Sequence, residues 1–209
     1  MSTLEYILDR FKLDTSGDMP VRWNGSRWHE LISIFKNVGF KIGVEVGVEK
    51  GMYSKRMASL IPDVKLYCID PWVSYGYYTS RRSNTSQKRM EEKYNEAVGR
   101  LAPFNCEIIR GYSHDVVHNF EDNSLDFVFI DANHGYEYAL QDMVIWTEKV
   151  RVGGIVSGHD YFNDEKCPAR CSVKDALDDF VRENEITPWF VMGRQKYTTW
   201  FFVKEEELP

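Results

Sequence analysis

Val44-Glu-Val-Gly-Val-Glu-Lys-Gly51 is the segment that decides the fold of this 209-residue chain. It ends an apolar, β-branched run over residues 41–46 and precedes a helical pattern over residues 52–60. Gly47 and Gly51 permit a tight turn and a close approach of the backbone to a ligand. The segment therefore predicts a strand, a glycine turn and a helix, which is the unit from which parallel α/β sheets are built.

The same alternation continues outward from this segment. Short runs rich in Val, Ile, Phe or Tyr, each ending in Gly, Pro, Asp or Ser, occupy residues 41–46, 65–69, 106–109, 125–130 and 154–157. Helical periodicity fills the intervals at residues 52–60, 86–101, 115–120 and 136–150. Nearly continuous apolar runs are typical of strands that are buried on both faces. We therefore predict parallel strands joined by crossover helices.

The end of the chain departs from this pattern. Residues 172–183 have a helical pattern, and two apolar runs at 189–192 and 198–203 flank the short polar segment 193–197. A hairpin joins the two runs most simply, which makes the last strand antiparallel to the rest of the sheet.

The first forty residues contain two further helical patterns, at 3–11 and 27–35, and these predict an N-terminal helical cap over the sheet. The expected architecture is a single domain over residues 1–209. It combines the cap, residues 1–40, with a Rossmann-like, doubly wound α/β core over residues 41–209.

Composition narrows the class of protein. The net charge is −6 and the sequence pI is about 5.4, so nucleic acid, whose phosphates need a basic face, is not expected as a partner. The basic residues Arg81, Arg82, Lys88 and Arg89 are more simply a solvated helix face than a binding patch. No apolar stretch reaches membrane-spanning length, and the N-terminus lacks a signal-peptide core. We expect a cytoplasmic protein without a membrane partner.

Four cysteines without a Cys-x-x-Cys pair argue against a disulfide-stapled fold. Cys68 and Cys106 lie in strand-like runs and are predicted to be buried thiols. Cys167 and Cys171 lie in the segment 163–172, a candidate wall of a substrate pocket. Their spacing does not match the common patterns of a structural zinc site.

The acidic residues of the opening segment indicate which kind of ligand its turn would hold. Glu45 and Glu49 place carboxylates beside the turn, whereas a pyrophosphate prefers bare N–H groups and a helix dipole. Position 45 also carries Glu where the Gly-x-Gly-x-x-Gly dinucleotide pattern needs glycine. An ammonium or sulfonium group suits these carboxylates better.

Two later strand ends offer further contacts to a cofactor. Asp70 follows the second strand and can accept hydrogen bonds from a ribose diol, as in NAD or S-adenosylmethionine, although it would also cap the turn before Pro71. After the third strand, Ser113 and His114 are candidates to contact adenine. The alternative role for Ser113 is to cap the next helix.

These residues together resemble the successive motifs of class I S-adenosylmethionine-dependent methyltransferases. The resemblance spans roughly residues 40–161 and rests on Glu45-Val46-Gly47, Asp70, the turn 111–115, the segment 124–136, Asp142 and the segment 152–161. The last two segments are similar to a branch of small-molecule O-methyltransferases that includes macrocin-type enzymes and, more distantly, catechol O-methyltransferase and cephalosporin hydroxylase-like proteins.

The resemblance implies a seven-stranded sheet whose C-terminal strand is antiparallel. It implies that Glu45 and Gly47 surround the methionine part of S-adenosylmethionine, with Asp70 on the ribose, and Gly51 is a further candidate cofactor-binding residue. Ser113 and His114 would lie near adenine, and Asp131 would border the cofactor. A small-molecule methyl acceptor would complete the site, while the acceptor's identity and the oligomeric state, with a homo-oligomer among the options, stay open.

The reacting end is predicted at two neighbouring strand ends. Asp131 and Asp160 would share one rim of the pocket, and their oxygens suit Mg²⁺ or another divalent cation. Tyr161 stands where the catechol enzymes have Asn, so the use of a metal stays open. His134, three residues beyond Asp131, is a candidate general base, although it could simply begin a helix. His159 is a second candidate, as a metal ligand or an alternative base.

The sequence therefore predicts an enzyme that methylates a small-molecule hydroxyl, with Asp131 and His134 as catalytic residues. Two alternatives remain. One is a metal-binding, hydroxylase-like relative on the same fold that transfers no methyl group, and the other is an NAD(P)-dependent oxidoreductase. The aromatic loop 72–82 is expected to form a substrate-facing wall, or to pack its rings on a neighbouring helix.

Overall fold

The computed structural model describes residues 1–74, 86–162, 171–193 and 198–206. Its helices are α1 (Thr3–Phe11), α2 (Ile32–Asn37), α3 (Met52–Leu60), α4 (Gln87–Leu101), α5 (Ser113–Val116), α6 (Tyr136–Lys149) and α7 (Val173–Glu183). Its strands are β1 (Val21–Trp23), β2 (Ile42–Val46), β3 (Lys65–Asp70), β4 (Cys106–Arg110), β5 (Leu125–Ile130), β6 (Val150–His159), β7 (Trp189–Met192) and β8 (Thr199–Val203). Among the described helices, none is long and apolar enough to cross a membrane.

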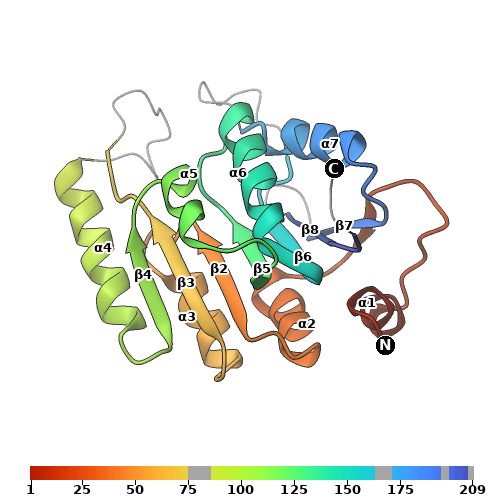
Figure 1. Cartoon of the computed structure of the whole chain (residues 1–209), viewed down its shortest axis with the longest axis horizontal. Helices are drawn as coiled ribbons and strands as arrows, with labels where there is room; N and C mark the ends of the chain where they lie inside the picture. Colours follow the sequence, from red (N-terminus) through yellow and green to blue (C-terminus); the bar gives the residue numbers. More distant parts are fainter. Residues whose placement is uncertain (75–85, 163–170, 194–197, 207–209) are drawn as a thin grey trace.

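The strands form one sheet in the order β1-β7-β8-β6-β5-β2-β3-β4 (Figure 1). Neighbouring strands are parallel except where β8 pairs with β6 and β7, so the prediction of an antiparallel last strand is confirmed. The chain runs from β2 outward to β4 on one side and returns to β5 on the other. The order therefore reverses between β2 and β5, which is where ligands bind in open α/β sheets.

The sheet has one strand more than the seven expected. β1 pairs in parallel with β7 and places Val21 opposite Phe190. Its three residues lie in the Gly/Pro/Asp-rich stretch after α1 and are too few to show a period-two pattern. Backbone pairing to the edge of β7 creates this strand, and hydrophobic periodicity does not report such pairing.

Helices cover both faces of the sheet. Buried residues of α1, α2, α3 and α4 form one apolar cluster against one face, and those of α5, α6 and α7 form a second cluster against the other (Figure 1). The predicted cap is therefore part of a helical layer. Its second helix differs from the prediction, because residues Arg27–Leu31 form a π-helical turn before α2, and Ser26 Oγ accepts the Trp28 N–H at 3.1 Å.

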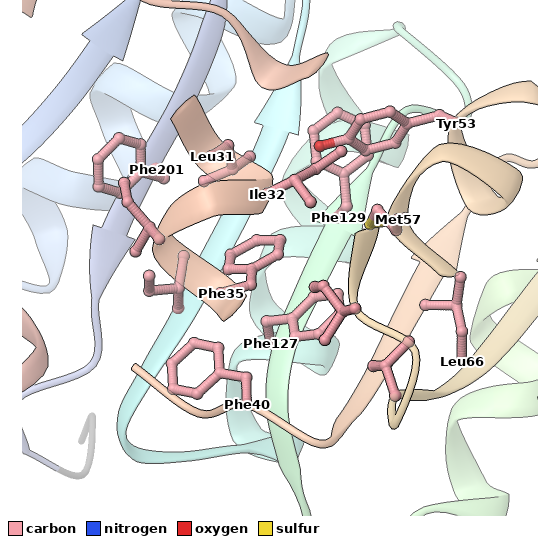
Figure 2. Packing of buried hydrophobic residues seen from close by; sticks show 14 of the residues in the cluster. Leu31, Ile32, Phe35, Phe40, Tyr53, Met57, Leu66, Phe127, Phe129 and Phe201 are labelled. Atoms are coloured by element: carbon pink, nitrogen blue, oxygen red, sulfur yellow. The ribbon is translucent and has the colours of Figure 1, made fainter. Parts of the chain in front are cut away.

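Aromatic packing fixes the carboxyl end of β5. Phe35 of α2 stacks on Phe127 with ring centroids 4.1 Å apart, and Tyr53 of α3 packs on Phe129 at 4.4 Å (Figure 2). Such contacts add to the large apolar area that aromatic rings bury. The next residue but one after Phe129 is Asp131, so this packing helps to hold a predicted catalytic residue at the edge of the sheet.

The predicted buried cysteines and the predicted helix at 115–120 can be located in the structure, whereas several other predicted features lie outside the described residues. Cys68 is buried and Cys106 is half-buried, and both are free thiols, so the prediction of burial is fully met only for Cys68. The predicted helix at 115–120 is instead the short α5 followed by a 3₁₀ turn (Val117–Asn119). Arg81, Arg82, Cys167 and most of the connection 193–197 lie outside the described residues.

Candidate active site

A cavity of about 1080 Å³ lies at the carboxyl ends of β2, β3, β4 and β5. It is lined by the loops that follow these strands and by Arg27 and Trp28 from the N-terminal segment. Among the residues predicted to bind cofactor or to act in catalysis, its lining includes Glu45, Gly47, Asp70, Ser113, His114, Asp131 and His134. Strand-end residues separated by up to 89 positions in sequence therefore meet in one place.

The two glycines of the opening segment have different tasks. Gly47 has a φ of 91°, and a Cβ built there would lie 2.1 Å from the carbonyl oxygen of Asp131. Only glycine fits such a close approach between the β2 and β5 ends. Gly51 has a φ of 70° and donates its N–H to the Val48 carbonyl at 2.8 Å, closing the turn before α3. Gly51 does not line the cavity, so its position supports a role in the turn.

Glu45 is a buried carboxyl group at the tip of β2. Its carboxyl oxygen accepts a short hydrogen bond from the Ser54 hydroxyl, and no ion pair among the described residues involves it. Burial raises the pKa of Glu45 to about 8, although the Ser54 hydroxyl and the Arg27 guanidinium act in the opposite direction. A cation entering the cavity would find an acceptor whose ionisation it favours.

Glu49 has a different environment. Its carboxylate lies 3.0 Å from Lys93 Nζ, and its side chain is mostly exposed although it borders the cavity. The two glutamates of the turn are therefore not equivalent. Glu45 is the carboxyl group that faces a ligand without a competing cation among the described ion pairs.

Asp70 holds the cofactor turn in place. Its Oδ2 accepts the N–H groups of Val48 and Glu49 at 3.0 and 2.9 Å, and its Oδ1 accepts the Trp72 N–H at 2.8 Å. Burial raises the pKa of Asp70, with the three backbone hydrogen bonds opposing it. A carboxylate has about four acceptor sites, so capacity for a ribose hydroxyl remains. The turn-capping alternative is thus seen in the structure, and it is compatible with ribose binding.

Ser113 is engaged inside the protein. Its hydroxyl donates to Asp142 Oδ1 at 2.5 Å and accepts from Trp146 Nε1 at 2.7 Å. It makes no helix cap, since the residue at the N-cap of α5 is Tyr112. Burial raises the pKa of Asp142 to about 6. The exposed ring of His114, stacked near that of Tyr112, is better placed than the Ser113 hydroxyl to meet a ligand.

Asp131 and Asp160 come together as the adjacent parallel strands predict. Asp131 follows β5 and Asp160 follows β6, and His134 Nε2 lies 3.4 Å from an oxygen of each. His159 Nδ1 lies 2.7 Å from the other oxygen of Asp160. The reacting end is therefore a compact group of two carboxylates and two imidazoles, of which Asp131 and His134 line the cavity.

Arg27 joins this group from the other end of the sequence. Its Nη1 donates to Asp131 Oδ2 at 2.7 Å, and its guanidinium lies over the rings of Tyr53 and Phe129. No motif marks Arg27 in the sequence, because it is carried on the π-helical turn, 104 positions from its partner. Only the tertiary arrangement reveals it.

Mutual attraction sets the charge state of the group. Burial would raise the pKa of Asp131, but the hydrogen bond from His134 and the charges of His159 and Arg27 outweigh it and hold that pKa well below its usual range. Burial would lower the pKa of His134, but its hydrogen bond to Asp131 and the charges of Asp131 and Asp160 outweigh it, so the net shift is upward. The carboxylates therefore stabilise an imidazolium at His134.

Comparison with known proteins agrees with this geometry. Residues 44–161, more than half of the chain, match the methyltransferase domain family. The chain belongs to this methyltransferase family. A search of curated proteins gave no match. The family match does not favour a hydroxylase-like relative without methyl transfer, or an oxidoreductase.

Solved structures share the fold of this methyltransferase. A candidate caffeoyl-CoA O-methyltransferase from Staphylococcus aureus has a TM-score of 0.63 at 14% identity, covering 96% of this chain and 90% of the other. The O-methyltransferase of tomaymycin synthesis from Streptomyces achromogenes, solved with S-adenosylmethionine, has a TM-score of 0.61 at 16% identity, with 95% and 86% covered. An O-methyltransferase from Bacillus cereus, solved with S-adenosylhomocysteine, has a TM-score of 0.61 at 16% identity, with 97% and 90% covered.

The methyltransferase also presents donors suited to a cation. One ligand atom each from Asp131, His159 and Asp160 lies within 4.8 Å of the others. Tyr161 cannot add to them, because its ring is buried and its hydroxyl donates to Asp178 Oδ1 at 2.6 Å. The donor set therefore contains the two predicted carboxylates and His159, the second candidate ligand that the sequence offered.

The predicted walls of the methyltransferase pocket are only partly described. Trp72 borders the cavity, but its ring is buried against Tyr94 and donates from Nε1 to the Glu49 carbonyl oxygen at 2.7 Å, so it supports the turn. Residues 75–82 and 163–170 lie outside the described residues.

Proposed function

We propose that the chain transfers a methyl group from S-adenosylmethionine to the hydroxyl of a small molecule. The observation that carries this proposal is Glu45, a buried carboxyl group that opens on the cavity beside Gly47. An ammonium group can donate a hydrogen bond to such a carboxyl group and favours its ionised form. A pyrophosphate would be repelled by the ionised Glu45 carboxylate. Two structurally similar O-methyltransferases were solved with S-adenosylmethionine or its demethylated product, which supports the choice of cofactor.

In this proposal, each part of the cofactor would contact a different strand end of the cavity. Glu45 would accept from the ammonium group, and Gly47 would let the backbone approach the methionine part. The remaining acceptor capacity of Asp70 would hold the ribose, and the ring of His114 would border adenine. The order of these residues along the cavity follows from the order of β2, β3 and β4 in the sheet.

The reaction needs a positioned nucleophile and a place for its proton. Bound S-adenosylmethionine supplies an electrophilic methyl group on a positively charged sulfur. The acceptor oxygen would take this methyl group, and the electron pair of the carbon–sulfur bond would stay on sulfur. His134 would take the hydroxyl proton, and Asp131 and Asp160, each with an oxygen 3.4 Å from its Nε2, would stabilise the imidazolium that results.

A divalent cation would suit the neighbouring group of side chains. Asp131, His159 and Asp160 would hold it, and it would supply a positive charge that stabilises the acceptor oxygen as the hydroxyl proton leaves. Carboxylate oxygens accept Mg²⁺, while an imidazole in the set also suits other divalent metals. Arg27 already donates to Asp131, so it would share that carboxylate with the ion.

The acceptor is expected to be a small molecule. Ligand pockets usually measure roughly 300–1,000 Å³, and the cavity of about 1080 Å³ has room for a cofactor and a small acceptor. The net charge of −6 does not favour nucleic acid as a partner. A single domain over residues 1–209, a cytoplasmic location and a homo-oligomeric state stay predictions.

Calorimetric titration with S-adenosylmethionine tests this function. We expect micromolar binding to the wild-type chain, a loss of at least about tenfold in affinity in Glu45→Gln, where a charge-assisted hydrogen bond is weakened, and no change in Glu107→Gln. Glu107 is a suitable control because it is exposed on β4 and pairs with Lys65, away from the cavity. Absence of binding at high micromolar cofactor, or tighter binding of NADH, would contradict the proposal.

A further inference from the structure

A second group of possible metal ligands lies beside the group of Asp131, His159 and Asp160. The proposed reaction does not use this second group as a metal site. Atoms of His134, Asp160 and Cys171 all lie within 4.8 Å of one another. Asp160 belongs to both groups, with Oδ1 facing His159 at 2.7 Å and Oδ2 facing His134 Nε2 at 3.4 Å. The Cys171 side chain is buried.

The backbone holds these three residues together. The Ser172 N–H donates to the His134 carbonyl oxygen at 2.9 Å, which joins the start of α7 to the loop after β5. Cys171 Sγ donates to the Asp160 carbonyl oxygen at 3.6 Å, which joins the same segment to the end of β6. Three separate segments are thus fixed with their donors converging, so a bound ion would need little rearrangement.

The separation of two of the donors is compatible with coordination of one ion. His134 Nε2 lies 3.4 Å from Asp160 Oδ2. In a tetrahedral zinc site the nitrogen and oxygen ligands lie about 2.0–2.1 Å from the ion, which places them about 3.3–3.4 Å apart. The distance between His134 Nε2 and Asp160 Oδ2 matches this distance between two ligands of one zinc ion.

The chemistry of the donors selects the ion. A thiolate and an imidazole suit Zn²⁺, Co²⁺ and related ions, whereas Mg²⁺ prefers oxygen ligands in octahedral geometry. His134 borders the large cavity, which gives an ion access and leaves a coordination position for solvent. Sequence spacing could not reveal this set, because the three residues follow β5, follow β6 and precede α7.

We propose that His134, Asp160 and Cys171 form a thiol-containing site for a zinc-class ion, which shares Asp160 with the group of Asp131, His159 and Asp160. Binding releases the thiol proton and places the ion on Nε2 of His134. Since that nitrogen is the proton acceptor of the proposed reaction, an occupied site inhibits methyl transfer. This consequence rests on the proposed function, and the binding itself does not.

Cobalt titration of chelator-treated, full-length protein tests the site. We expect a sulfur-to-cobalt charge-transfer band in the near ultraviolet that Zn²⁺ abolishes at stoichiometric amounts and that millimolar Mg²⁺ leaves intact. Cys171→Ser should lose the band and bind Zn²⁺ at least about 100-fold more weakly, since even outer-shell partners of a metal contribute 10- to 100-fold. Cys106→Ser, and Cys167→Ser outside the described residues, should keep both properties.

Four results would overturn the site: no cobalt binding, cobalt binding without the band, a band that survives Cys171→Ser, or a band lost only in Cys167→Ser. Titration of the same preparations with S-adenosylmethionine separates this failure from that of the proposed function. Cofactor binding without a cobalt band would contradict only the metal-site proposal. A cobalt band without cofactor binding would contradict only the proposed function.

Discussion

At the scale of single residues, Glu45 is the most informative side chain. In the sequence it is only the acid that breaks a dinucleotide pattern. In the structure it is a buried carboxyl group with one hydroxyl partner, and burial raises its pKa to about 8 from an ordinary value of 4.5. The protonated form is therefore the stable one in the folded protein near neutral pH.

The raised pKa of Glu45 predicts how stability depends on pH. The unfolded chain loses the Glu45 proton near pH 4.5, and the folded chain loses it only near pH 8. The contribution of this proton to the free energy of unfolding is therefore complete below pH 4.5 and decreases as the pH rises to 8. The loss is on the order of a few kcal/mol. We expect Glu45→Gln to flatten this slope in urea unfolding at pH 5, 6.5 and 8. Glu107→Gln should keep the wild-type slope, and an unchanged slope in Glu45→Gln would contradict the assigned burial effect.

His134 carries the second prediction at this scale. Removing a general base costs typically 10²- to 10⁴-fold in rate, so His134→Ala should lower kcat by about that factor. Its affinity for S-adenosylmethionine should stay within about threefold, since its ring lies at the acceptor end. His118→Ala, on the exposed 3₁₀ turn after α5, serves as the control. An active His134→Ala variant would remove this residue from the proton-transfer step.

At the scale of elements, the meeting of β2 and β5 depends on Gly47. Its positive φ and the carbonyl of Asp131 both exclude a side chain. Gly39 offers a comparison, because it also has a positive φ, of 81°, but would place a Cβ in open space.

Alanine at these two glycines should therefore have unequal effects. Left-handed backbone costs roughly 1–2 kcal/mol for a residue with a Cβ, so Gly39→Ala should lose about that much stability. Gly47→Ala should lose clearly more, because the clash with the Asp131 carbonyl adds to the strain, and it should also weaken cofactor binding. Equal losses in thermal unfolding would show that the close approach is not a constraint.

The sequence predicted the elements whose side chains follow a clear hydrophobic pattern. It did not predict the elements that depend on backbone pairing or on contacts with distant residues. The apolar runs at 125–130 and 189–192 coincide with β5 and β7 because both strands are buried. β1 escaped prediction because pairing with β7 forms it. The π-helical turn escaped because its sequence has an ordinary helical pattern.

At the scale of the whole molecule, the site is assembled from one edge of the sheet and from segments that reach over it. Strand order brings Glu45, Asp70, Asp131 and Asp160 to that edge, and this much followed from the alternation of strands and helices. Arg27 arrives from the N-terminal segment and Cys171 from the start of α7. Neither contact is encoded in local spacing, so only the folded chain shows them.

The central claim is that Glu45 meets the ammonium group of S-adenosylmethionine. If a group with a pKa of about 8 becomes ionised on binding, the complex should release about one proton at pH 7. Calorimetric titration with S-adenosylmethionine in two buffers of different ionisation enthalpy measures this number directly. The account predicts release of about one proton from the wild-type chain and close to none from Glu45→Gln. Binding without proton release in the wild-type chain, or no binding at high micromolar cofactor, would contradict it.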